Sequence, residues 1–135
     1  MAHPVNLKEE LAKFDQVYSP RIVGRVNDYD IRLAHTKGEH VWHVHDRSDE
    51  FFLALDGEFH ISLREPGSGE RTVVLRKGDI FVVPKGVEHK PSSPGGSIMM
   101  FEPAGTVSTG DRYEGDLPEY VDSTAGHAVE AEKLG

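Results

Sequence analysis

Residues 38–57 of this chain have the sequence GEHVWHVHDRSDEFFLALDG. His43 and His45 lie two positions apart in a segment that we expect to be a strand. Residues i and i+2 of a strand project from the same face, roughly 6.5–7 Å apart. The two imidazoles therefore lie side by side, at a separation from which both can reach one metal ion.

Two further residues extend this pattern. Glu50 begins an apolar segment after the loop 46–49, and we expect a neighbouring strand to bring its carboxylate opposite the histidine pair. Two histidines and one carboxylate form the triad that suits iron(II) and leaves coordination positions open. His89 follows a turn at residues 84–86 and is the fourth candidate. A His-x-His pair alone is more often a surface or core feature, but burying all these groups without a metal costs several kcal/mol.

The segment from Arg21 to Glu102 consists of short strands divided by turn residues. Tyr29, Ile31 and Leu33 alternate with polar neighbours, which is typical of a half-buried strand. Gly and Pro place expected turns at residues 36–39, 56–57, 66–69, 77–79, 84–86 and 94–96. Many short strands with no intervening helix predict a sandwich or a closed barrel.

Strand alternation also predicts which side chains line the barrel. Phe52 and Ala54 share the parity of Glu50 and are expected inside. One pair from residues 98–101 must join them, and the pattern leaves Ile98 with Met100 and Met99 with Phe101 as open alternatives. His40 has the opposite parity to His43 and is expected to point away from the metal. Arg32 is expected on a solvated face.

The two ends differ from the middle of the chain. Asn6 is a plausible N-cap for a short helix, with Glu9 three residues on. Residues 104–135 contain seven acidic and two basic side chains, so we expect an acidic extension that metal binding does not need. We therefore divide the chain into an N-terminal helical segment (1–20), a barrel (21–103) and an acidic C-terminal extension (104–135).

Composition excludes several function classes. The 135 residues carry a net charge of −8, which disfavours nucleic acid and anionic membranes as partners. The chain has no cysteine, so thiolate metal sites and disulfides are excluded. No apolar run approaches the ~18 residues of a membrane helix, and no signal peptide is visible. We expect a cytoplasmic homodimer whose partner is a small molecule.

The sequence resembles the cupin superfamily. The first cupin motif is matched in order by Gly38, His43, His45, Glu50 and Gly57, with the gap after Gly38 one residue short. The second motif is matched by Gly78, Pro84, Gly86 and His89, and Ser93 stands where the family has Asn. The resemblance implies an all-β, single-domain cupin, a double-stranded β-helix or jelly-roll barrel. It also implies that His43, His45, Glu50 and His89 are metal ligands. The finer resemblance is to small cupins labelled mannose-6-phosphate isomerase-like, which describes fold kinship and not a substrate.

Three functions fit these features. The favoured one is a metal-dependent, oxygen-dependent oxidoreductase acting on a small molecule, with Glu50 alternating between ligand and base. The second is a metal-assisted sugar isomerase or epimerase. The third is a non-catalytic module that binds a small ligand. The cofactor is one divalent transition metal per chain, and the residues leave Fe, Mn, Ni, Cu and Zn open.

Overall fold

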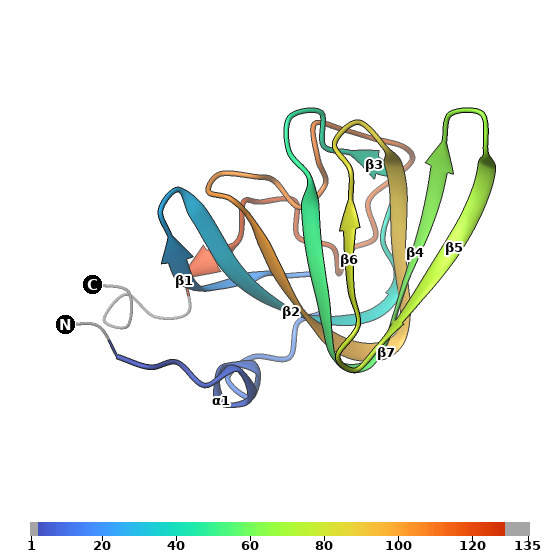
Figure 1. The fold of residues 1–135 in the computed structure, drawn as a ribbon. Helices are drawn as coiled ribbons and strands as arrows, with labels where there is room; N and C mark the ends of the chain where they lie inside the picture. The colour runs from blue at the N-terminus through green and yellow to red at the C-terminus, as the bar shows by residue number, and fades with distance from the viewer. Residues whose placement is uncertain (1–2, 129–135) are drawn as a thin grey trace.

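The fold is almost entirely β-structure, as expected (Figure 1). The computed structural model describes residues 3–128, and within them the one helix is α1 (Leu7–Leu11). The strands are β1 (Arg21–Val26), β2 (Tyr29–Glu39), β3 (His43–Val44), β4 (Glu50–Glu65), β5 (Gly69–Arg76), β6 (Ile80–Val83), β7 (Glu88–Pro103), β8 (Arg112–Tyr113) and β9 (His127–Ala128). They form one curled sheet in the order β5-β4-β7-β2-β1-β9. β6 pairs with β4, and β3 lies between β7 and β8.

Two long antiparallel strands, β4 and β7, run the length of the barrel. The hairpin expected at residues 56–57 and the turn expected at residues 94–96 are both wrong, because each is an irregularity inside a continuous strand. Gly57 pairs with Gly96 there, and a Cβ added to Gly57 would lie 2.0 Å from the carbonyl oxygen of Gly95. These glycines permit close approach of two bent strands and do not reverse the chain.

The turn expected at residues 36–39 is wrong for a similar reason. β2 continues through it to Glu39, with a shift in its pairing to β7 between Thr36 and Gly38. The strand expected to contain both His43 and His45 is shorter, because only His43 and Val44 form β3. Residues 40–42 therefore do not follow strand alternation.

The barrel interior is apolar around its middle. Phe52 and Ala54 are buried there, as predicted. Of the two open alternatives in β7, the structure places Ile98 and Met100 in the core, exposed by 2% and 6%. The core also contains Phe59, Ile61, Leu63, Leu75 and Val83.

β2 turns its polar face inward, opposite to the expectation. Arg32 has no solvent exposure, so the prediction of a solvated side chain is wrong. Its guanidinium lies 3.1 Å from carboxylate oxygens of both Asp30 and Glu102, and it donates to the carbonyl oxygen of Thr106 at 2.7 Å. Two carboxylates and a carbonyl replace the water that this cation would need.

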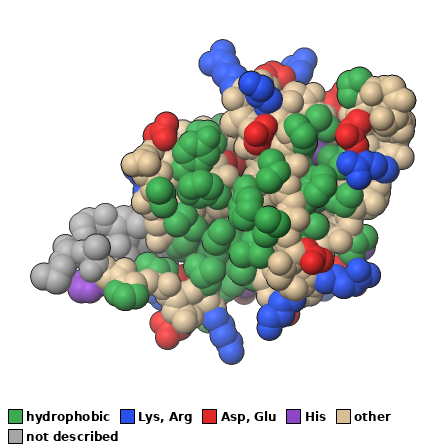
Figure 2. All heavy atoms as spheres, viewed as in Figure 1, with side chains coloured by type: hydrophobic (Ala, Val, Ile, Leu, Met, Phe, Trp, Pro, Cys, Tyr) green, Lys and Arg blue, Asp and Glu red, His purple; other side chains and the backbone are tan. Residues whose placement is uncertain are grey.

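The outer face of the same sheet is apolar and uncovered. Figure 2 shows hydrophobic side chains gathered over the face formed by β2, β4, β6 and β7. Phe51 pairs with Val82 on one side and Phe101 on the other, and Phe101 pairs in turn with Ile31. Ile80, on β6, is 60% exposed. We call the outward side chains of Ile31, Phe51, Leu53, Ile80, Val82, Met99 and Phe101 the outer apolar face.

The two end segments pack on the barrel. Asn6 caps α1 by accepting the backbone N–H of Glu9 at 3.0 Å, as predicted. His35 Nε2 lies 2.8 Å from the carbonyl oxygens of both Leu11 and Phe14, so this histidine anchors the helix end. Beyond Pro103 the chain returns across the barrel, where β8 pairs with β3 and β9 pairs with β1.

No helix within residues 3–128 has the length and apolar character needed to cross a membrane.

Candidate metal centre

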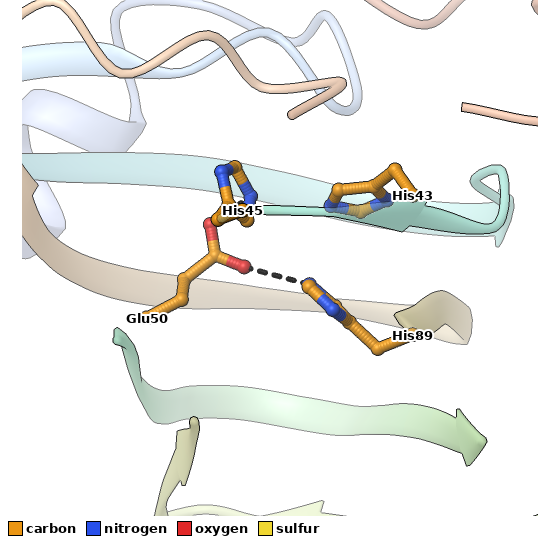
Figure 3. Close-up of side chains that lie close together, drawn as sticks. All are labelled: His43, His45, Glu50 and His89. Atoms are coloured by element: carbon orange, nitrogen blue, oxygen red, sulfur yellow. Dashed lines mark hydrogen bonds and ion pairs between the residues drawn. The ribbon is translucent and has the colours of Figure 1, made fainter. Parts of the chain in front are cut away.

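Three histidines and one glutamate meet inside the barrel at one end of β4 (Figure 3). His43 lies in β3, directly opposite His89 of β7. His45 follows β3 by one residue, and Glu50 is the first residue of β4. All four are buried, and one potential ligand atom from each lies within 4.8 Å of the others. The structure thus brings together every ligand candidate named from the sequence.

Glu50 is the centre of this cluster. Its Oε1 lies 3.0 Å from Nε2 of His89, and its Oε2 lies 3.2 Å from Nε2 of His45. The rings of His43 and His89 pack with their centroids 4.2 Å apart. The carboxylate therefore contacts two imidazoles, and the third imidazole packs beside one of them.

Backbone carbonyls orient two of the rings. Nδ1 of His43 lies 2.8 Å from the carbonyl oxygen of Val41, and Nδ1 of His89 lies 3.0 Å from that of Val87. A carbonyl oxygen only accepts, so each Nδ1 carries the proton and each Nε2 of the neutral ring presents a lone pair. The lone pair of His89 then faces a carboxylate oxygen. A cation bound by both removes this acceptor–acceptor contact, so the residues fit a metal ion.

The electrostatics of the cluster favour the same occupant. Burial lowers the pKa of His43 well below its usual value, so this ring is neutral. Burial opposes ionisation of both His45 and Glu50, but their mutual attraction raises the pKa of His45 and holds the pKa of Glu50 well below the ordinary value. The neutral ring of His43 and the ionised carboxylate of Glu50 are in the protonation states that metals need, and a metal ion would replace the proton that Glu50 favours on His45. Metal–ligand bonds of about 2.1 Å place opposite donor atoms about 4.2 Å apart, close to the spread seen here.

A cavity opens beside the cluster. The space within it that water can occupy is about 30 Å³. Its walls are mostly apolar, and three lining residues lie outside the predicted barrel range 21–103. The lining residues are Tyr18, Pro20, Ala34, His40, His43, Glu50, Phe52, Phe59, Pro91, Ile98, Met100, Glu102 and Ser108.

His40 lies on this cavity wall, so the prediction that it points away from the cluster is wrong. It is buried, and its ring centroid lies 4.9 Å from that of His43. Burial lowers its pKa to about 4. Strand alternation fails here because residues 40–42 are not in a strand. The sequence contains one sign of this irregular segment: the gap between Gly38 and His43 is one residue shorter than the corresponding gap in the cupin motif.

Glu102 is a second cavity residue that the sequence analysis did not identify. Its Oε1 accepts from Arg32 at 3.1 Å, and its Oε2 has no hydrogen-bond partner among the described residues. Burial, reinforced by the charge of Glu50, raises the pKa of Glu102 well above its ordinary value. Glu102 has the same strand parity as Ile98 and Met100. Had these two been predicted to face the barrel interior, Glu102 would have been predicted to face it as well.

Two other histidines are not part of the cluster. His35 binds the end of α1, and His60 pairs with Glu58 at 2.9 Å on the outside of β4. Trp42 packs under the guanidinium of Arg64, which lies 3.7 Å from its ring centroid, so Trp42 is a packing residue.

The chain matches known proteins over its barrel. The model of the Cupin domain matches residues 31–105. An uncharacterized protein of Bacillus subtilis, YdbB, is 37% identical over 87 residues, which are 64% of this chain and 67% of that protein. The 3-hydroxyanthranilate 3,4-dioxygenase of Brucella anthropi is 40% identical over 62 residues, 44% of this chain. The match spans only 34% of the length of that dioxygenase.

Solved structures agree with the fold. A cupin-2 domain containing protein from Shewanella frigidimarina superposes with a TM-score of 0.68 at 37% identity, covering 73% of this chain and 93% of that one. Hydroquinone 1,2-dioxygenase from Sphingomonas sp. TTNP3, solved in complex with 4-nitrophenol, gives a TM-score of 0.66 at 27% identity. That comparison covers 75% of this chain and 32% of the dioxygenase. With its barrel, its His/Glu cluster and a family match over residues 31–105, the chain belongs to the cupin superfamily.

Proposed function

We propose that His43, His45, Glu50 and His89 hold one divalent transition metal and that the protein oxidises a small hydroxylated aromatic molecule with O₂. The observation that carries this proposal is the buried cluster itself, whose ligand atoms lie within 4.8 Å and which borders an apolar cavity. When bound, the metal supplies a Lewis acid and a site for oxygen chemistry. Iron is the first candidate among the open identities.

The cavity favours an aromatic ligand over a sugar. Phe52, Phe59 and Met100 contribute apolar walls. The hydroxyl of Tyr18 already donates to the carbonyl oxygen of Gly38 at 2.6 Å, and that of Ser108 donates to the carbonyl oxygen of Asp122. Few polar groups therefore remain to pair with the many hydroxyls of a sugar, and unpaired buried hydroxyls cost free energy.

The related dioxygenases support the same class of substrate. Their names specify hydroxylated aromatic rings, 3-hydroxyanthranilate in one case and hydroquinone in the other. A dioxygenase places both atoms of O₂ in its product, so its reaction balances without an added reductant. We propose that Glu50, besides binding metal, accepts the proton of the ring hydroxyl that enters the cavity.

Elemental analysis followed by an oxygen-electrode assay tests this function. The iron(II)-loaded protein is expected to consume O₂ with hydroquinone or 3-hydroxyanthranilate, and the EDTA-treated protein is not. Isomerisation of mannose 6-phosphate without O₂ uptake would support the sugar isomerase instead. Tight binding of a phenol with no turnover in either assay would support the non-catalytic module.

A further inference from the structure

The hydrogen bonding of His40 fixes the position of its proton. The backbone N–H of Val41 donates to Nδ1 of His40 at 2.8 Å. An Nδ1 that accepts carries no proton, so the ring is neutral and its one N–H is on Nε2. This assignment follows from the donor at Val41.

The Nε2–H group of His40 has no acceptor within residues 3–128. The side chain is buried, and the space that it borders is the cavity beside the metal cluster. The hydroxyls of Tyr18 and Ser108 on the same wall already have carbonyl acceptors. Nε2 of His40 is not sealed from solvent, so the acceptor that it meets in the cavity is either water or a ligand oxygen.

Two neighbouring rings hold His40 in place. Tyr18 packs edge-on against it with centroids 5.3 Å apart, and His43 packs at 4.9 Å. The donor is therefore fixed before any ligand enters, which lowers the entropic penalty of using it. His40 is not among the four residues whose ligand atoms lie close enough to share a metal.

We propose that His40 is a ligand-selecting residue that donates from Nε2 to the phenolic oxygen of the molecule in the cavity. This inference rests on the proposed function, since it assigns a role in the same cavity. It adds a basis for discrimination between ligands, because an aromatic ring without an oxygen acceptor leaves the His40 donor unpaired.

4-Nitrophenol is the probe, because its absorbance reports both binding and ionisation of the phenol. The full chain is loaded with zinc, which is redox-inert, so the readout is binding and not turnover. His40→Phe removes the donor at similar size, and His40→Leu is a second removal variant in case the first does not fold. His40→Gln retains an N–H donor. His60→Phe is the control on the outer face of β4.

We expect His40→Phe and His40→Leu to weaken 4-nitrophenol binding about tenfold, the equivalent of one hydrogen bond to a partly charged oxygen. The pH at which the bound phenol ionises should rise, because the donor stabilises the phenolate. His40→Gln should recover part of both effects. Nitrobenzene, which has no phenolic oxygen, should bind all variants equally, and zinc content should not change.

Each contrary outcome has one meaning. A folded His40→Phe or His40→Leu variant with full zinc content and unchanged 4-nitrophenol affinity overturns the inference, because the donor then faces only water. Loss of zinc from these variants overturns it by making His40 a metal ligand. If the unaltered protein takes up no zinc, the proposed metal site fails. If it takes up zinc but does not bind 4-nitrophenol, the phenolic ligand class fails and the role of His40 fails with it.

Discussion

His89 and Glu50 contact each other across the barrel interior, with Nε2 of the ring 3.0 Å from Oε1 of the carboxylate. The other ring nitrogen of His89 lies 3.0 Å from the carbonyl oxygen of Val87. One imidazole thereby connects the backbone at the start of β7 to the only acid of the cluster. Its orientation is fixed by the fold, so the cluster is arranged before a metal binds.

Loss of any cluster histidine should abolish most of the stabilisation that metal provides. Metal at a hundredfold excess over its Kd stabilises the folded state by about 2.7 kcal/mol, several degrees in Tm for a domain of this size. His43→Ala, His45→Ala and His89→Ala should lose this EDTA-sensitive shift. Glu50→Gln should retain part of it, because imidazoles bind borderline metals more strongly than one carboxylate does.

His60→Ala is the matched control for these variants, because His60 pairs with Glu58 outside the cluster. Thermal melts with and without EDTA, together with bound metal per chain, give the comparison. Metal loss from His60→Ala with retention by His89→Ala would show that the cluster is not the metal site.

The buried cation Arg32 should contribute far more to stability than the exposed cation of the same network. Arg32→Met removes the buried cation that Asp30 and Glu102 share, and breaking a buried pair costs about 3–5 kcal/mol. Arg25 pairs with Asp30 at 2.9 Å, but its side chain is 59% exposed. Arg25→Met should therefore cost less than about 1 kcal/mol. Urea unfolding measures both, and equal losses would refute the difference in burial.

His40 should make the metal-free protein sensitive to acid. Its pKa is about 4 in the fold against 6.5 in the unfolded chain. Between these values the unfolded state binds more protons, so the free energy of unfolding falls as pH falls from about 6.5 to about 4. This single group contributes a loss on the order of 3 kcal/mol. In EDTA, His40→Gln should show a shallower loss than the unaltered protein, and parallel pH profiles would contradict this.

The acidic extension should be dispensable for the metal and needed for the cavity. All four candidate ligands precede residue 90, so a chain ending at Ala104 should still bind one metal. It lacks Ser108 of the cavity wall and the pairing of β8 with β3, so 4-nitrophenol affinity and Tm should both fall. Metal analysis and circular dichroism test this. A folded shortened chain without metal would overturn the proposed boundary at residue 103.

We expect a homodimer formed through the outer apolar face. The face is continuous across four strands, and a two-fold axis places the same patch on both partners. Light scattering should give twice the chain mass of 15.0 kDa. Ile80→Glu with Val82→Glu should produce monomers, whereas Val74→Glu, on β5 and outside this face, should not. A monomer in the unaltered protein would contradict the expectation.

The spacing of residues in the sequence was enough to predict the barrel and the four members of the cluster. Strand alternation and the two motifs depend on local backbone geometry, which a sequence pattern can reveal. Alternation failed where the backbone is not a regular strand. His40 lies in such a segment, so its inward position depends on how the chain bends after Gly38. Gly57 and Gly96 show a second limit of prediction from sequence. Glycine occurs wherever the backbone is unusual or two segments approach closely, so the residue type alone does not distinguish a turn from a bulge inside a strand.

Long-range pairing decided the remaining features. The polar face of β2 turns inward because Arg32 meets Glu102, seventy positions away along the chain. Neither residue alone predicts that contact, and a lone arginine in a strand is usually solvated. Ser108 reaches the cavity wall only because the chain returns across the barrel after Pro103.

Tyr18, Pro20 and Ser108 line the cavity but lie outside the family match at residues 31–105, whereas the whole metal cluster lies within it. The metal cluster and these three wall residues therefore lie on different segments of the chain. Substitutions at these three positions change the cavity wall without removing a candidate metal ligand. We expect that exchanging these flanking segments between related barrels reshapes the cavity and leaves the four candidate ligands in place.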